Sequence, residues 1–489
     1  MTYDPPVVAD ETFLNFGAAL LDHAGAQGDK PAVILEDRRV SWSDFGAMVA
    51  QVAGKLRDLG IGRGDTVASL AENSIEHVVL YSAVVTAGAC IVPLPFSATA
   101  EALTRMMSDS GSRLLFASPA QIEVARSLGA PQVIALVGVM DWAADAAPAG
   151  AADVQPDDLF NIIYSSGTTG LPKGIVQTHR ARMHWAFSNA VEMGFDSRAR
   201  ALVTTPLYSN GTWLMMLPVL FAGGTLHVMP SFDAAEFLQT VERERITHTF
   251  MVPAQYIMVL DRPELDHADL SSLKTVLSAG SPLRRDTKRQ VIERISPGLF
   301  ELYGYSEGFA SILRPSQHDE KFDTVGTPVI GFEVCILDDE GRQLPAGEAG
   351  EIAGYGAGIM TQYHDRPEQT AELIWRDARG RSFIRSGDIG MLDEDGFLKI
   401  LDRKKDMIIS GGFNVFPSDV ETIVGQHPDV KDVTVIGVPH RKWGEWCNAR
   451  LAKTQRLVGV ELRDEFPRNA LGKVIKKDLR APYWDGVDS

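Results

Sequence analysis

Ser165-Ser-Gly-Thr-Thr-Gly-Leu-Pro-Lys-Gly174 is the segment of this chain that most narrows both its fold and its chemistry. Glycine lets a backbone approach a ligand closely, and free N–H groups together with hydroxyls suit phosphate oxygens. Lys173 adds a mobile cation next to a proline. The hydroxyls and glycines that precede it are Ser165, Ser166, Gly167, Thr168, Thr169 and Gly170. The segment therefore predicts a loop that clamps the phosphates of a nucleotide.

The surroundings of this loop differ from those of a Walker loop, which needs Gly-Lys followed by Ser or Thr at the start of a helix. Here Pro172 precedes the lysine, Gly174 follows it, and apolar runs at 159–164 and 175–176 flank the loop. Such runs predict two strands joined by the loop. The alternative is a flexible Gly/Ser/Thr surface turn, and turns of that kind usually lack a Pro-Lys-Gly exit and a strand on either side.

The length and charge of the chain limit its class. Its 489 residues exceed one ordinary core, so two to four domains are expected. An apolar share of 45% and a charged share of 23% are typical of a globular protein. The net charge of −17 argues against binding of nucleic acid, whose phosphates it would repel. A polyanionic ligand would need a local cationic pocket in this acidic chain.

Three cysteines and the pattern of apolar residues bear on location. Cys90, Cys335 and Cys447 are odd in number and far apart, which suits a reducing cytoplasm better than disulfides or a zinc site. The first twelve residues hold three acidic side chains and no apolar stretch, so no signal peptide is expected there. The apolar run at 78–92 is short and ends at Pro93, which predicts a buried helix entering a strand and no stable membrane insertion.

The alternation of strands and helices predicts an α/β fold. Short Val/Ile/Leu strands alternate with helical patterns, which implies parallel sheets sandwiched by helices. From about 324 to 400 the pattern changes to short strands separated by glycines, which predicts a distorted β-barrel subdomain. We expect a large N-terminal domain at 1–402 and a small mobile α+β C-terminal domain at 403–489. The strands expected in the first part are 66–70, 90–93, 114–117, 133–137, 247–252 and 275–279.

Two carboxylates stand where a nucleotide could be bound. Glu307 lies near Gly304, where the backbone can approach a ligand, and it suits Mg²⁺ when phosphates supply the other oxygens. Tyr303 offers a ring for stacking on a base. Asp388 lies on a glycine turn and can accept two hydrogen bonds from ribose hydroxyls. Taken alone, the first could be a hairpin with an exposed Glu and the second a solvated turn.

The loop at 165–174 resembles the signature of the adenylate-forming superfamily, which comprises acyl-CoA synthetases, aryl-CoA ligases, luciferases and the adenylation domains of peptide synthetases. Six elements follow the superfamily's order along 160–473. Besides the loop, they are Ser278-Ala-Gly-Ser-Pro-Leu283, Tyr303-Gly-Tyr-Ser-Glu307, Arg385-Ser-Gly-Asp388, Asp402-Arg-Lys-Lys-Asp406 with its following glycines, and Pro467-Arg-Asn-Ala-Leu-Gly-Lys473. Ser306 replaces the usual threonine and keeps its hydroxyl. Gly354-Tyr-Gly-Ala-Gly358 with Tyr363 and Pro367 is similar to a further glycine-rich stretch of the superfamily.

This resemblance implies roles for individual residues. It makes Lys473, Glu307 and Thr168 catalytic, with Glu307 and Thr168 reaching the metal. Lys405 is the implied hinge, and Gly411 and Gly412 line the implied CoA tunnel. The acyl pocket is expected around Tyr208, Asn210 and Trp213. The ATP and AMP contacts are implied for Ser165, Ser166, Gly167, Thr169, Gly170, Lys173, Gly280, Ser281, Tyr303, Gly304, Tyr305, Ser306, Asp388 and Arg403.

The implied function is that of an AMP-forming carboxylate–CoA ligase with a fatty or aryl acid, such as a hydroxycinnamate, as substrate. ATP, Mg²⁺ and coenzyme A are the implied cofactors and substrates, and a homodimer is compatible with this class. A stand-alone enzyme that loads a carrier protein, or a luciferase-like oxygenase, would share these motifs. An amino-acid adenylation domain would place an acidic residue at 204–213, where none occurs. After Glu445, about twenty residues of the superfamily pattern have no counterpart, roughly one strand, a turn and a helical turn.

Overall fold

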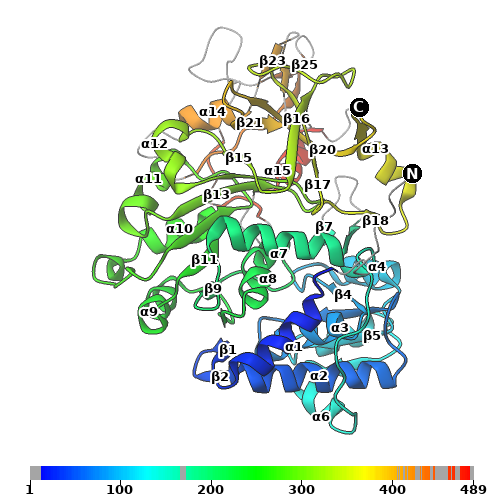
Figure 1. Ribbon diagram of the computed structural model, residues 1–489. Coiled ribbons are helices and arrows are strands. Elements are labelled where there is room, and N and C mark those ends of the chain that lie inside the picture. Colours follow the sequence, from blue (N-terminus) through cyan, green and yellow to red (C-terminus); the bar gives the residue numbers. More distant parts are fainter. Residues whose placement is uncertain are drawn as a thin grey trace, which may run out of the picture.

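The computed structural model describes residues 13–165, 172–404, 406, 408–410, 413–415, 417–424, 430, 432–440, 444–446, 461–463, 465–468 and 474–484. Its main body holds two large sheets and a smaller curled one, and a fourth small sheet is built from the C-terminal part of the chain. Figure 1 shows α7 running across the middle of the molecule, with the N-terminal elements on one side and the C-terminal elements at the opposite end.

The first large sheet contains the two strands on either side of the predicted phosphate loop. Its seven strands follow the order β18-β8-β7-β4-β3-β5-β6. The inner pairs are parallel, whereas β8 runs antiparallel to both of its neighbours, β7 and β18. These strands are β3 (Thr66–Leu70), β4 (Cys90–Pro93), β5 (Leu114–Ala117), β6 (Val133–Ala135), β7 (Leu159–Ser165), β8 (Lys173–Thr178) and β18 (Gln362–Tyr363).

The second large sheet has nine strands in the order β15-β14-β13-β12-β11-β9-β10-β1-β2. Its central pairs are parallel and both of its edges are antiparallel. The strands are β1 (Pro31–Leu35), β2 (Arg38–Ser41), β9 (Arg200–Val203), β10 (Thr225–Val228), β11 (His248–Met251), β12 (Thr275–Ala279), β13 (Leu299–Gly304), β14 (Ala310–Leu313) and β15 (Thr327–Pro328).

Helices cover these sheets, and most long helices begin at a side chain that caps their free N–H groups. Ser74 caps α3, Thr178 caps α7 and Asp233 caps α9. The helices are α1 (Phe16–Gln27), α2 (Trp42–Asp58), α3 (Ile75–Thr86), α4 (Ala100–Ser110), α5 (Ile122–Ser127), α6 (Val139–Ala143), α7 (His179–Met193), α8 (Trp213–Phe221), α9 (Ala234–Glu244), α10 (Pro253–Leu260), α11 (Arg285–Arg294) and α12 (His318–Lys321). Short 3₁₀ turns occupy Leu136–Gly138, Asn210–Thr212, Pro263–Asp266 and Pro315–Gln317.

The remaining elements form two antiparallel sheets. The five-stranded curled sheet consists of β16 (Phe332–Leu337), β17 (Gly350–Gly356), β19 (Ile374–Arg376), β20 (Ser382–Leu392) and β21 (Leu398–Arg403), and α13 (Pro367–Leu373) precedes β19. The four-stranded sheet consists of β22 (Ile408–Ser410), β23 (Phe413–Val415), β24 (Val438–His440) and β25 (Gly444–Trp446). The helices α14 (Pro417–Val424) and α15 (Lys476–Trp484) accompany it (Figure 1).

The α/β class with parallel sheets, a curled antiparallel sheet and a C-terminal α+β part is confirmed. The strands expected at 66–70, 90–93, 114–117 and 275–279 have the expected ends. The strand expected at 133–137 stops at Ala135, because a 3₁₀ turn takes up Leu136–Gly138. The strand expected at 247–252 runs only from His248 to Met251.

The apolar run at 78–92 is a buried helix followed by a strand, as expected: nearly every residue of α3 and all of β4 are buried. Within the part of the chain that the structure describes, none of the helices combines the length and apolar character needed to span a bilayer. Cys90 and Cys335 are buried free thiols, whereas Cys447 lies outside the described residues.

Candidate functional site

The phosphate loop joins two neighbouring antiparallel strands, as the sequence predicts. Ser165 at the end of β7 pairs with Lys173 at the start of β8, so the loop between them closes a hairpin. Ser166, Gly167, Thr168, Thr169 and Gly170 lie outside the described residues. The hairpin therefore fixes where the loop starts and ends at one end of β7 and β8.

Glu307 is held next to this hairpin by Tyr363. The phenol of Tyr363 donates a hydrogen bond to Glu307 Oε1 over 2.6 Å, and the Lys173 ammonium lies 4.8 Å from the centre of the same ring. Burial, and then the charge of Glu307, raise the pKa of Tyr363, so its phenol stays protonated and remains a donor. Tyr363 is positioned by β18, in which it pairs with Ile175 of β8. Among the described residues, Glu307 Oε2 has no hydrogen-bond partner.

Tyr303, Asp388 and Arg403 form a second group at the end of β13. The phenol of Tyr303 donates to Asp388 Oδ2 over 2.7 Å, and Arg403 Nε lies 3.6 Å from Asp388 Oδ1. Asp388 and Arg403 are direct partners in the pairing of β20 with β21. Burial and the neighbouring carboxylate raise the pKa of Tyr303, which keeps this phenol a donor too. Sequence motifs far apart in the chain thus meet at one place.

The backbone between the two groups is fixed by its own contacts. Tyr305 donates from its phenol to the Ile384 carbonyl over 2.9 Å, and Gln177 Nε2 lies 3.3 Å from the Ser306 carbonyl. A Cβ on Gly304 would lie 2.7 Å from the carbonyl oxygen of Phe309, so this position needs glycine. The remaining predicted contacts follow β12, where Gly280 has a φ of +90° and Ser281 comes next.

The glycine-rich stretch in β17 serves close packing behind Glu307. A Cβ on Gly354 would lie 2.3 Å from the ring of Phe309, and a Cβ on Gly308 would lie 2.4 Å from the Gly358 carbonyl. Gly308 also has a φ of +114°, which other residues rarely adopt. These glycines let the turn that carries Glu307 lie directly against the curled sheet.

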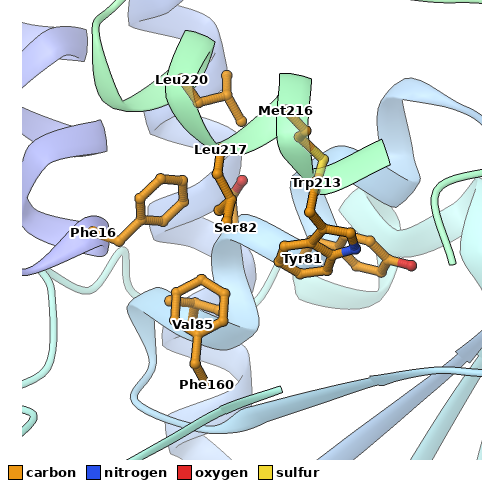
Figure 2. Close-up of a pocket in the computed structure, with 9 residues that line it drawn as sticks. All are labelled: Phe16, Tyr81, Ser82, Val85, Phe160, Trp213, Met216, Leu217 and Leu220. Carbon is orange, nitrogen blue, oxygen red and sulfur yellow. The ribbon is translucent and has the colours of Figure 1, made fainter. Parts of the chain in front are cut away.

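The three residues predicted for the acyl pocket lie in different surroundings. Trp213 is buried and lines a small apolar cavity of about 10 Å³, enough for about one water molecule (Figure 2). Tyr208 instead bonds its hydroxyl to Ser97 Oγ at 3.2 Å, and Asn210 accepts a hydrogen bond from Arg182. The cavity is lined by Phe16, Tyr81, Ser82, Val85, Phe160, Trp213, Met216, Leu217 and Leu220.

The sequence did not single out Tyr363 as the partner of Glu307, nor Gln177 and Arg182 as neighbours of the site. Tyr363 was quoted only as part of a glycine-rich motif, because its contact crosses 56 positions of the chain. Arg182 was missed because its burial follows only from the packing of α7, most of whose residues are buried. Four residues with predicted roles lie outside the described residues: Lys405, predicted as the hinge, Gly411 and Gly412, predicted to line the CoA tunnel, and Lys473, predicted to be catalytic.

The hairpin at 165–173, Glu307 beside it and Asp388 held by Tyr303 lie where the sequence predicts the site of an enzyme that activates a carboxylate with ATP. The model of the AMP-binding enzyme family matches residues 20–364, and that of the AMP-binding enzyme C-terminal domain matches 419–477. The chain belongs to this adenylate-forming family, within its AMP-forming acid–thiol ligases.

Named relatives cover almost the whole chain. A feruloyl-CoA synthase of Amycolatopsis sp is 34% identical over 91% of this chain and 94% of its own length. The medium/long-chain-fatty-acid–CoA ligase FadD8 of Mycobacterium tuberculosis is 31% identical over 94% of this chain and 88% of its own. The crystal structure of ATP-bound MatB from Rhodopseudomonas palustris superposes with a TM-score of 0.86 at 29% identity, covering 96% of this chain and 99% of MatB.

Proposed function

We propose that the protein joins a fatty or aryl carboxylic acid to coenzyme A in two steps. In the first, the carboxylate attacks the α-phosphate of ATP, and pyrophosphate leaves the acyl-adenylate. In the second, the CoA thiol attacks the acyl carbon, and AMP leaves as the thioester forms. Neither step needs an enzyme nucleophile, only positioning and neutralisation of charge. The contact series Lys173–Tyr363–Glu307 at the exit of the phosphate hairpin carries this proposal.

The phosphate end of ATP is assigned to the hairpin. Lys173 brings a cation to its exit, in a chain whose net charge is −17. Local positive charge is required there because a polyanion would otherwise be repelled by the protein as a whole. The hydroxyls and N–H groups between Ser165 and Lys173 supply hydrogen bonds to the β- and γ-phosphates, which neutralise the leaving pyrophosphate.

Glu307 fits a divalent cation. One of its carboxylate oxygens is held by Tyr363, and the other has no partner among the described residues. Mg²⁺ commonly takes one or two carboxylates and completes its octahedron with phosphate oxygens and water. Thr168 is the second protein ligand that the superfamily resemblance implies. Magnesium bound there would neutralise charge on the phosphates, while Tyr363 keeps the carboxylate aimed at them.

The adenosine end of ATP is assigned to the second group. Tyr303 offers its ring to adenine, while its hydroxyl orients Asp388 toward the ribose hydroxyls. Arg403 lies next to the same carboxylate and can reach the ribose or the α-phosphate. Gly280, Ser281, Gly304, Tyr305 and Ser306 supply the backbone on either side of the base.

The second half-reaction is assigned to the C-terminal part. Lys473 would bridge the acid's carboxylate and the α-phosphate during adenylation, and Lys405 would be the pivot about which the small domain turns. Gly411 and Gly412 would then line the path of the CoA thiol. The small domain already contacts the main body, since Arg284 donates to Asp432 over 2.8 Å.

A panel of fatty and aryl acids, assayed for CoA-dependent release of AMP, tests the reaction. Lys473→Ala should abolish adenylation and spare thioester formation from preformed acyl-adenylate. Equal loss of both half-reactions would refute the role of Lys473. Release of AMP only in the presence of a carrier protein would instead indicate an enzyme that loads that carrier. Light emission in the presence of oxygen would indicate a luciferase-like oxygenase.

A further inference from the structure

Arg182 is a cation buried between α7 and the sheet that carries β7 and β8. Arg182 is only 4% exposed, and its guanidinium donates to Asn161 Oδ1 over 2.6 Å and to Asn210 Oδ1 over 2.9 Å. Both acceptors are neutral amides. Among the described residues no carboxylate forms an ion pair with Arg182. Burial lowers its pKa to about 9, so the group is still cationic at neutral pH. A buried charge of this kind normally has an anionic partner.

The Asn161 amide, which accepts from Arg182, has a second buried amide as its cross-strand neighbour, that of Gln177. Asn161 Nδ2 and Gln177 Oε1 have no hydrogen-bond partner among the described residues, although both side chains are almost fully buried. Asn161 and Gln177 are direct partners in the β7–β8 pairing, so their side chains project from the same face of the sheet. Buried amides are normally satisfied, and a cluster of unsatisfied ones therefore indicates a missing ligand.

The cluster lies next to the reacting centre but away from the phosphate loop. Gln177 contacts the Ser306 carbonyl, one residue before Glu307. It is two positions along β8 from Ile175, the partner of Tyr363, which corresponds to roughly 7 Å. Asn161 is four positions before the start of the loop, roughly 13 Å along β7. The cluster therefore lies beside the turn that carries Glu307 and some residues along the strands from the ends of the loop.

The wall on the other side of Arg182 is aromatic. Its guanidinium lies 5.1 Å from the centre of the Trp213 ring, and Tyr81 stacks on that ring at 5.3 Å (Figure 2). Phe160 meets Trp213 edge-on at 5.9 Å. Asn210 and Trp213 both belong to the segment in which the sequence predicts the acyl pocket. An aromatic wall with one cation set into it suits an acid that is apolar along its length and bears oxygen at its far end.

We propose that Arg182, together with Asn161 and Asn210, recognises a second oxygen function at the end of the acid remote from the reacting carboxylate. The inference rests on the proposed function and adds to it a substrate class: acids whose tail ends in a carboxylate or a ring hydroxyl. The guanidinium donates to that oxygen, and Asn161 Nδ2 supplies a further donor. A planar guanidinium binds a carboxylate through two parallel hydrogen bonds, which a lysine cannot reproduce.

Matched pairs of acids test this assignment in the full-length protein. Octanoic acid is compared with octanedioic acid, and cinnamic acid with its para-hydroxy and para-carboxy derivatives, by AMP release with CoA. The wild type should favour an oxygen-bearing member of a pair in kcat/KM. In Arg182→Met that preference should fall about 100-fold, since a site built to bind an oxygen strongly rejects analogues that lack it. Arg182→Lys keeps the positive charge, and its preference for the oxygen-bearing acid should lie between those of the wild type and Arg182→Met.

Arg180→Met is the matched control, because Arg180 lies on the same helix but is exposed and pairs with Asp157 at the surface. It should leave the preference as in the wild type. The aliphatic and aromatic pairs distinguish a carboxylate-ended from a hydroxyl-ended substrate. The inference is wrong if the wild type has the same kcat/KM for both acids of each pair and Arg182→Met does not change the ratio of the two values. The proposed ligase activity would stand in that case. If no acid releases AMP, the proposed function itself fails. If the methionine variant does not fold, the preference of the wild type within each pair of acids still tests the inference.

Discussion

Replacing Tyr363 by phenylalanine removes one hydroxyl and leaves the ring in place. The lost hydrogen bond is short, at 2.6 Å, and its acceptor is the Glu307 carboxylate. Hydrogen bonds to charged groups contribute about 1.5–3 kcal/mol, and each 1.4 kcal/mol corresponds to about a tenfold change in rate. We therefore expect the rate of adenylation to fall about 10- to 100-fold. The Mg²⁺ concentration needed for half-maximal rate should rise, because Glu307 loses the contact that orients it.

The assay is pyrophosphate release under saturating acid and ATP, repeated over a Mg²⁺ titration. The control is Tyr355→Phe. Tyr355 belongs to β17 of the curled sheet, where its ring packs on Phe383 and beneath Arg381, and its hydroxyl forms no hydrogen bond with any residue that the structure describes. This control should keep the wild-type rate and Mg²⁺ dependence. A Tyr363→Phe enzyme with wild-type rate and wild-type Mg²⁺ dependence would refute the positioning role of the phenol.

Two further predictions concern stability. Burial lowers the pKa of four histidine side chains to about 4 or below. Between pH 6.5 and 4, the unfolded chain therefore binds protons at these histidines that the folded chain does not bind. As the pH is lowered through this range, the free energy of unfolding should decrease by up to about 1.4 kcal/mol per pH unit for each histidine. Urea unfolding at several pH values in this range measures how steeply the free energy of unfolding changes with pH. His227→Asn should make this dependence shallower, and an unchanged dependence would contradict the lowered pKa of His227. The four residues are His77, His179, His227 and His248. Gly354→Ala should lower the free energy of unfolding by about 1–3 kcal/mol because its Cβ would overlap the Phe309 ring. Gly150→Ala, which meets open space, should change that energy by less than about 0.5 kcal/mol, and equal effects of the two substitutions would refute the packing argument.

Much of the fold could be predicted because its signals are local. The strands on both sides of the phosphate loop follow from apolar runs of strand length, and the hairpin between them is confirmed. Strand ends were less reliable, as at Ala135, where local turn preference competes with strand pairing. Gly354 and Gly356 of β17 could be read only as part of a motif, since the rings that they must accommodate, those of Phe309 and Phe332, come from other segments of the chain.

The sequence by itself determined the α/β class, the position of the β7–β8 hairpin and the family to which the chain belongs, because short motifs and periodicity encode backbone geometry within a few residues. Only the tertiary structure decided that Tyr363 holds Glu307, across 56 positions, and that Tyr303 holds Asp388, across 85. It also decided that Arg182 is buried against the neutral amides of Asn161 and Asn210. Such contacts depend on how strands pair and helices pack, and these long-range choices leave no local trace in the order of residues.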